Sequence, residues 1–168
     1  MKIAAKNLAY TAMFTAICFL TNYLYIPFGE LFSVSFMPMV CFVSSFFLNP
    51  FLALLVGCIS DTLGCFAKGY APNVYILLAS SLWGLIMGIC YRIKWDKPAI
   101  KIILGASIGF VVCSLLLNSY GLYGYTSKGI PFWKYMLTRA PVQLLNLAVN
   151  VFLTILLERA LRKRNILR

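Results

Sequence analysis

The chain has 168 residues, of which 62% are hydrophobic and only 11% are charged, and its mean hydropathy is +0.88. Soluble domains carry about 25% charged residues, so this composition excludes an ordinary soluble domain and predicts a protein that lipid solvates. The net charge is +11, but the basic residues lie between apolar runs rather than on one basic face, which argues against nucleic-acid binding.

Six apolar runs in succession are each long enough to form a membrane-spanning helix, which needs about 20 mostly apolar residues. The expected helices are residues 8–25, 31–48, 51–67, 74–91, 98–118 and 133–160. Pro38 should kink or break the second of them. We therefore predict an all-α integral membrane protein, a six-transmembrane-helix bundle that forms a single domain over residues 1–168.

The first run could be mistaken for a signal peptide, because Lys2 and Lys6 precede an apolar stretch. It is long and aromatic, however, and it has no small-x-small cleavage site before Pro27. We therefore interpret it as a helix of the mature protein.

The orientation of the bundle follows from the distribution of Lys and Arg. With the N-terminus inside, the cytoplasmic segments hold eleven of them: Lys2, Lys6, Arg92, Lys94, Lys97, Lys101, Arg159, Arg162, Lys163, Arg164 and Arg168. The outer segments hold four: Lys68, Lys128, Lys134 and Arg139. The positive-inside rule then places both termini in the cytoplasm.

In the first helix, small residues recur at spacings of 4, 3 and 4, which places them on one face. They are Ala5, Ala9, Ala12 and Ala16. Such a face lets another helix approach closely in lipid, so it could pack inside the bundle or dock a partner subunit.

The sixth helix carries a polar stripe with the same spacing, formed by Arg139, Gln143, Asn146 and Asn150. Polar groups in a span normally face the interior or a wet cavity. The stripe could join helices through hydrogen bonds, but four polar residues in register favour the wall of a ligand site.

Asp61 is the single acid within a span, and it lies about two turns from Lys68. It could form a salt bridge with Lys68 or Arg139, or it could bind two N–H donors of a planar heterocycle.

The outer loops are rich in Tyr, Gly, Pro and Asn. The aromatic residues there could be interfacial belt residues or could stack on a flat ligand. They are Tyr70, Tyr120, Tyr123, Tyr125 and Trp133, with Asn22, Asn73 and Asn118 close by.

Several chemistries have no pattern in this sequence. There is no phosphate-binding loop to energise transport, no His for a zinc protease, and no C-x-x-C among the six cysteines. We expect no catalytic residue, no metal site and no cofactor, and a lone buried acid argues against an ion-driven carrier.

Length, topology and the A-x-x-x-A of Ala12 and Ala16 together resemble the substrate-binding S components of energy-coupling factor (ECF) vitamin transporters. Two further motifs resemble the folate-specific branch: Leu117-Asn118-Ser119, and Arg139-Ala140-Pro141 opening the last helix.

The resemblance implies a subunit of the plasma membrane that captures a vitamin outside and docks its alanine face onto a transmembrane scaffold subunit, while two ATPase subunits consume ATP. The expected ligand-binding set is Asp61, Lys68, Tyr70, Asn73, Asn118, Tyr120, Lys128, Trp133, Arg139, Gln143 and Asn146. Folate is the first candidate and riboflavin or thiamine the next. A small lipid-modifying membrane enzyme and a self-sufficient channel or carrier are the alternatives.

Overall fold

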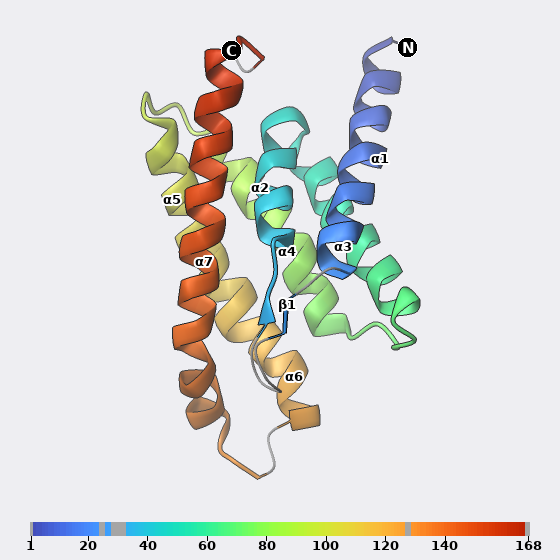
Figure 1. The fold of residues 1–168 in the computed structure, drawn as a ribbon, viewed down its shortest axis with the longest axis vertical. Coiled ribbons are helices and arrows are strands. Elements are labelled where there is room, and N and C mark those ends of the chain that lie inside the picture. The colour runs from blue at the N-terminus through green and yellow to red at the C-terminus, as the bar shows by residue number, and fades with distance from the viewer. Residues whose placement is uncertain (1, 24–25, 28–32, 127–128, 167–168) are drawn as a thin grey trace.

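The computed structural model describes residues 2–23, 26–27, 33–126 and 129–166. Helices make up nearly all of this part, and a short antiparallel ribbon is the exception (Figure 1). In chain order the elements are α1 (Lys2–Tyr23), β1 (Ile26–Pro27), β2 (Ser33–Val34), α2 (Met37–Phe47), α3 (Pro50–Ala67), α4 (Val74–Tyr91), α5 (Pro98–Gly109), η1 (Phe110–Asn118), α6 (Ser119–Thr126) and α7 (Phe132–Lys163). The predicted helical class is confirmed.

Asparagine caps begin two of these helices. The Asn49 side chain accepts a hydrogen bond from the Leu52 N–H at 2.8 Å, and Pro50 occupies the first turn of α3, where its missing N–H costs no bond. The Asn73 side chain accepts from the Tyr75 N–H at 3.0 Å and begins α4. Residues 48–49 alone therefore connect α2 to α3.

The second helix is shorter than the sequence predicted. A helix over residues 31–48 was expected, but Ser33–Val34 pairs with Ile26–Pro27 and α2 begins only at Met37. Pro38 lies in the first turn of α2, so it starts the helix rather than kinking or breaking it. Eleven residues reach about 16 Å, which is roughly half of the hydrocarbon core of a bilayer.

Four helical stretches are long and apolar enough to cross a membrane. They are Pro50–Ala67, Val74–Tyr91, Pro98–Thr126 and Phe132–Lys163. The third of them joins α5, η1 and α6 into one continuous helix. The predicted membrane character is therefore supported, whereas the six-span count stays a prediction.

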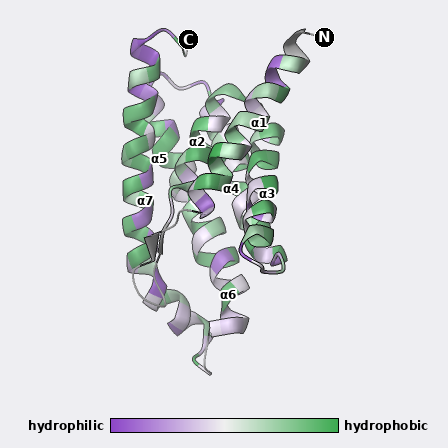
Figure 2. Cartoon of the chain, turned by 45° about the vertical axis from the view of Figure 1, so that its right-hand side comes forward, coloured by the Kyte–Doolittle hydropathy of each residue, from purple (hydrophilic) through white to green (hydrophobic). Residues whose placement is uncertain are grey.

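The two ends of the bundle differ in what they carry (Figure 1). The beginning of α1 and the end of α7 lie together at one end, which we call the terminal end, and α6 lies at the opposite end, the α6 end. Figure 2 shows apolar residues over most of the helical surface and hydrophilic residues at the terminal end of α1 and α7. The ends of α1 and α7 at one end of the bundle fit an even number of crossings, and the cytoplasmic location of that end stays a prediction from the positive-inside rule.

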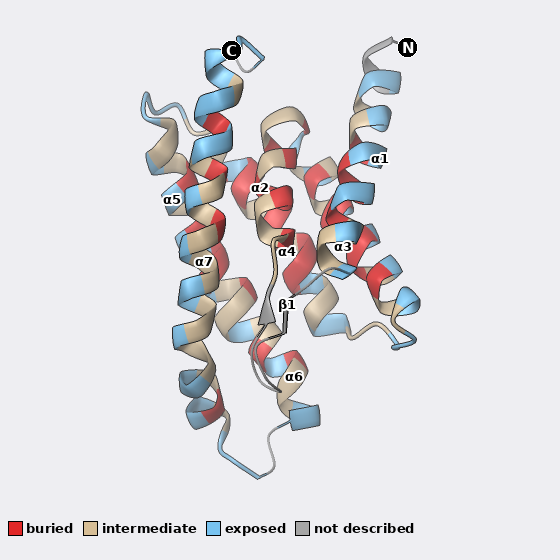
Figure 3. Cartoon of the chain, in the orientation of Figure 1, coloured by how far each residue is buried: buried red, intermediate tan, exposed pale blue. Residues whose placement is uncertain are grey.

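Helices α3 and α4 pack at backbone distance, through glycines. A Cβ atom added at Gly57 would overlap the Ser80 carbonyl oxygen, and one added at Gly84 would overlap the carbonyl of Ala53. Buried residues concentrate along α2, α3 and α4 in the middle of the bundle (Figure 3). This close approach sets the position of α4, which contributes one wall of the site described below.

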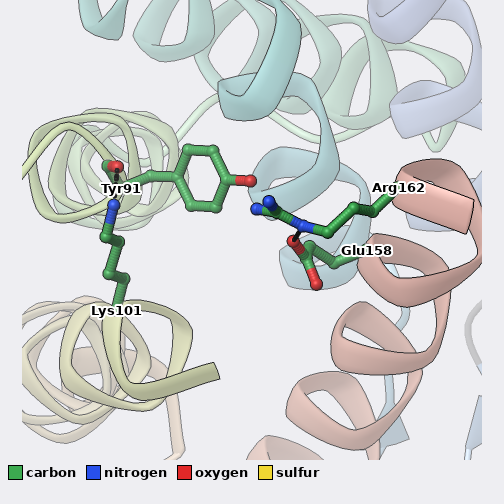
Figure 4. A network of polar contacts seen from close by, with 4 residues as sticks. All are labelled: Tyr91, Lys101, Glu158 and Arg162. Carbon is green, nitrogen blue, oxygen red and sulfur yellow. Dashed lines mark hydrogen bonds and ion pairs between the residues drawn. The ribbon is translucent and has the colours of Figure 1, made fainter. Parts of the chain in front are cut away.

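A polar network joins the helices near the terminal end (Figure 4). Glu158 of α7, only 2% exposed, accepts a hydrogen bond from Arg162 Nε at 2.9 Å. The Tyr91 hydroxyl of α4 points toward the Arg162 guanidinium. Lys101 of α5 lies over the Tyr91 ring, with 5.6 Å between Nζ and the ring centroid, and Tyr91 packs on Phe46 of α2.

Candidate ligand-binding site

A polar cavity of about 140 Å³ lies inside the bundle. Its walls come from the β2–α2 connection, α2, α4, η1 and α7. The lining residues are Ser35, Met37, Pro38, Ala79, Ser80, Trp83, Ser114, Asn118, Arg139, Gln143, Asn146, Leu147 and Asn150. Most of them are polar, which is unusual for the interior of an apolar bundle and is typical of a ligand or water site.

The polar stripe of α7 forms one wall, because Arg139, Gln143, Asn146 and Asn150 all line the cavity. Arg139 lies about 10 Å along the helix from Phe132, and Asn150 lies about 27 Å along it. The stripe therefore runs from the α6 end into the middle of the bundle.

Asn150 at the deep end of the stripe is already fully hydrogen-bonded. Its Nδ2 donates to the Ser35 carbonyl at 3.0 Å and to Asn146 Oδ1 at 2.8 Å, and its Oδ1 accepts from the Met39 N–H at 3.0 Å. This residue ties α7 to the start of α2. At Asn150, therefore, the stripe joins helices through hydrogen bonds.

The other end of the stripe is different. Arg139 Nη1 and both Gln143 amide atoms, Oε1 and Nε2, are buried and have no hydrogen-bond partner in the described part of the chain. Each buried polar atom that lacks a partner costs about 1–3 kcal/mol, and a charged one costs more. These atoms therefore identify the place where water or a ligand has to complete the site.

Tyr135 supports the Arg139 side chain. The guanidinium carbon lies 5.5 Å from the Tyr135 ring centroid, and the Tyr135 hydroxyl shares a 2.6 Å hydrogen bond with Thr126 Oγ1 of α6. Tyr135 is buried at 5% exposure. The cation is thus held over an anchored ring, and its orientation toward the cavity is fixed without a carboxylate partner.

The wall that α4 contributes includes an aromatic side chain. Trp83 of α4 lies there at 7% exposure and meets the Phe42 ring edge-on, with 5.2 Å between the ring centroids. Ala79 and Ser80, one turn earlier on α4, continue this wall. The cavity therefore offers a flat ring both polar groups and an indole.

The η1 segment has π-helical geometry, and it contributes Ser114 and Asn118 to the cavity. The Ser119 hydroxyl donates to the Ser114 carbonyl at 3.2 Å, which satisfies an acceptor in this wider turn. Departures from α-helical geometry of this kind are frequent at functional sites. The sequence contains no signal for η1. The contributions of Ser35, Ser80, Trp83 and Ser114 were also missed, although two serines within a span are a polar signal.

The structure places Asp61 outside this cavity. Asp61 Oδ1 accepts from Asn22 Nδ2 at 3.2 Å, and Lys68 Nζ donates to the Asn22 carbonyl at 2.8 Å. Ser80, which lines the cavity, lies beside the Asp61 carboxylate. Burial lowers the pKa of Lys68, while nearby Cys65 and Asp61 act in the opposite direction. Asp61 and Lys68 thus form a polar group behind the α4 wall.

The predicted aromatic contacts at the α6 end gather around a second, more open hollow of about 380 Å³. Its lining is Asn73, Tyr75, Tyr120, Gly121, Tyr123, Gly124 and Tyr125. The Asn73 amide donates to the Gly121 carbonyl at 2.9 Å, and the Tyr75 and Tyr120 rings meet edge-on.

Other predicted site residues lie apart from the cavity. Tyr70 and Trp133 are 68% and 67% exposed, and Lys128 lies outside the described residues. Of the predicted set, the structure brings four together around the cavity: Asn118, Arg139, Gln143 and Asn146.

The alanine face of α1 turns away from the bundle. All four of its members, Ala5, Ala9, Ala12 and Ala16, are exposed. Phe14 and Cys18, on the other side of α1, are buried in the core. In the described part of the chain the alanines therefore do not serve helix packing, and they remain open to a partner.

Comparison with known proteins decides the family. The model of the ECF transporter substrate-specific component matches residues 6–158, which is most of the chain. The chain belongs to this family. It is therefore a substrate-binding subunit of a membrane transporter, as the resemblance of its length, topology and motifs implied.

Two solved structures share the fold of this S component. FolT bound with folic acid superposes with a TM-score of 0.74 at 19% sequence identity, over 90% of this chain and 92% of that chain. The S component of a bacterial ECF transporter gives a TM-score of 0.70 at 19% identity, over 95% of this chain and 97% of the other. No curated protein sequence matches significantly.

Proposed function

We propose that this S component binds folate from outside the cell in the polar cavity between α4, η1 and α7, and that it serves a vitamin importer. The observation that carries the proposal is three buried atoms, Arg139 Nη1 and Gln143 Oε1 and Nε2, that have no hydrogen-bond partner among the described residues and belong to side chains lining the same cavity as Trp83. Folate offers a flat pterin ring with donors and acceptors on its edge. A solved structure with the same fold, FolT, holds folic acid.

The size of the cavity limits which part of the ligand it takes. At about 140 Å³ it is smaller than the 300–1,000 Å³ of typical sites for drug-sized ligands. We therefore assign it to the ring system, with the aminobenzoyl-glutamate portion extending toward the α6 end.

Orientation supports capture from outside. The eleven cytoplasmic bases include those of the terminal end, and Arg139 lies in the half of α7 nearer the α6 end. The cavity would then open to the side where a nutrient arrives in the plasma membrane.

Transport would require partners, because the sequence holds no phosphate-binding loop. We assign the exposed alanine face of α1 to docking on a scaffold subunit, which two ATPase subunits would drive. Small residues allow close helix approach in lipid, and the exposure of Ala12 and Ala16 leaves that face available.

The experiment is to identify the small molecule that co-purifies with the detergent-solubilised protein, by absorbance and mass spectrometry, and then to titrate the emptied protein. Bound folate, and tighter binding of folic acid than of riboflavin or thiamine, is expected. Binding of riboflavin or thiamine instead would retain the family and reject folate. Failure to bind any of the three would reject the proposed ligand class.

A further inference from the structure

Gln143 combines two properties that its neighbours on the stripe lack. Its carbonyl oxygen and its amide nitrogen are both buried, and neither has a hydrogen-bond partner among the described residues. The side-chain oxygen of Asn146, Oδ1, by contrast, already accepts a hydrogen bond from Asn150 Nδ2 at 2.8 Å. Gln143 thus offers one acceptor and two donors to whatever occupies the cavity.

Arg139 limits which ligand atoms can lie next to it. A guanidinium only donates hydrogen bonds, so a ligand atom that faces Arg139 Nη1 has to be an acceptor. Gln143 lies one helical turn deeper on the same face. Together the two side chains complement an edge that carries an acceptor oxygen next to an N–H.

We propose that Gln143 determines specificity by binding the lactam edge of the ligand's heterocycle, a ring carbonyl beside a ring N–H. The Gln143 amide would donate to the ring carbonyl and accept from the ring N–H, while Arg139 donates to the same side of the ring. This inference rests on the proposed function, because in folate that edge is the 4-oxo edge of the pterin. An amino group in place of the oxo group would direct N–H donors at Arg139.

The test compares the affinities of the purified protein for folic acid and for its 2,4-diamino analogue, which has an amino group in place of the 4-oxo group. We expect wild type to prefer folic acid by at least about tenfold, because the diamino compound presents an N–H to Arg139, which can only donate, and has no N–H at N3 for the Gln143 carbonyl to accept. Equal affinities, or a preference for the diamino compound, would overturn the inference.

Gln143→Glu tests the residue directly. A carboxylate only accepts, so it repels the 4-oxo oxygen of folic acid. The diamino ring is more basic and takes up a proton at N1, and the carboxylate can form an ion pair with that N1–H and the neighbouring 2-amino group. The preference for folic acid should fall by about tenfold or more. An unchanged ratio of the two affinities would contradict the proposal.

Asn146→Asp is the matched control, because it makes the same change one turn deeper on α7. Its carboxylate would face the Asn150 amide, so both ligands should weaken by a similar factor and their ratio should stay the same. A shift in the ratio as large as that of Gln143→Glu would mean that added charge, not Gln143, sets the preference.

The outcomes separate the two proposals. Wild type that binds neither compound rejects folate as the ligand. Wild type that binds folic acid, with a ratio that Gln143→Glu does not change, rejects only the role of Gln143. Should the Glu variant fail to fold, Gln143→Met removes the amide without adding charge, and retention of the full wild-type ratio in it would also overturn the inference.

Discussion

Two residues of one polar stripe, Asn150 and Gln143, differ in their hydrogen bonds. Asn150 is 1% exposed and ties Ser35 and Met39 to α7, whereas the buried amide of Gln143 has no partner in the described residues. Spacing predicted the stripe. Spacing could not show which residues of the stripe are hydrogen-bonded within the protein, because the partners of Asn150 lie more than a hundred residues away along the chain.

This difference predicts opposite effects on the stability of the ligand-free protein. Asn150→Leu leaves the Met39 N–H and the Ser35 carbonyl without a partner, and it should destabilise the fold by about 1–3 kcal/mol. Gln143→Leu removes atoms that are unpaired already, so stability should be unchanged or slightly higher while ligand affinity falls. Thermal unfolding in detergent, with and without folic acid, checks both. Equal destabilisation by the two changes would contradict the assignment.

Asp61 shows where reasoning about residue type reaches its limit. An acid in a span is a reasonable candidate for ligand contact, although Asp61 is not the single one that the sequence predicted, because Glu158 is also buried in α7. In the structure Asp61 Oδ1 accepts from Asn22 and the carboxylate lies beside Ser80, which lines the cavity, so its contact with a ligand stays a prediction. The residue type predicted that the Asp61 carboxylate is buried and interacts with other groups, but only the tertiary fold determines on which side of α4 it lies.

At the scale of elements, the glycine contact between α3 and α4 positions one wall of the cavity. Gly57→Ala would bring a methyl group into the Ser80 carbonyl, so α4 has to move. We expect a loss of about 1–3 kcal/mol of stability together with weaker ligand binding, measured by thermal unfolding and titration. Gly124→Ala is the control, because nothing lies within 4 Å of a Cβ at that position. Equal effects of the two changes would refute the packing argument.

The ion pair at the terminal end of α7 gives a second prediction for an element. Arg162→Met leaves the buried Glu158 carboxylate without its ion-pair partner and should destabilise the fold by roughly 1–3 kcal/mol. Adding Glu158→Leu should restore most of that loss, because the uncompensated charge is removed. A double-mutant cycle in thermal unfolding measures the coupling. No coupling would mean that the network in Figure 4 does not hold α7.

Helix prediction succeeded where local signals govern and failed where tertiary contacts do. Asn49-Pro50 and Asn73 start helices near the expected residues, because caps act locally. Ser33 and Val34 belong to the expected second helix, but their pairing with β1 places them in a strand instead. Likewise, the amino-acid composition of η1 does not predict its π-helical geometry.

At the scale of the whole molecule, the proposed docking role of the exposed alanine face predicts that ligand binding and transport can be separated by mutation. Ala12→Leu with Ala16→Leu should leave folic acid affinity of the isolated subunit unchanged, since both residues point away from the bundle. Uptake in cells that also express scaffold and ATPase subunits should be lost. Ile17→Phe, which adds bulk on another exposed side of α1, should retain uptake. Normal uptake by the double variant would disprove docking through this face.

The amino-acid composition alone predicts a membrane protein. The structure adds where the cavity lies relative to the two ends of the bundle. The unpartnered groups of the cavity lie on the half of α7 nearer the α6 end, and the basic termini lie at the other end. A ligand that binds in the cavity is therefore held on the side opposite the basic termini.

The central claim is that this cavity holds the vitamin, and Arg139 tests it most directly. The measurement is the affinity of purified protein for folic acid, by titration calorimetry, in wild type, Arg139→Ala and Arg159→Ala. Arg159 lies on the same helix but is exposed at the terminal end. We predict that Arg139→Ala weakens binding at least about tenfold and that Arg159→Ala leaves it unchanged. Equal affinity in all three proteins would contradict the account.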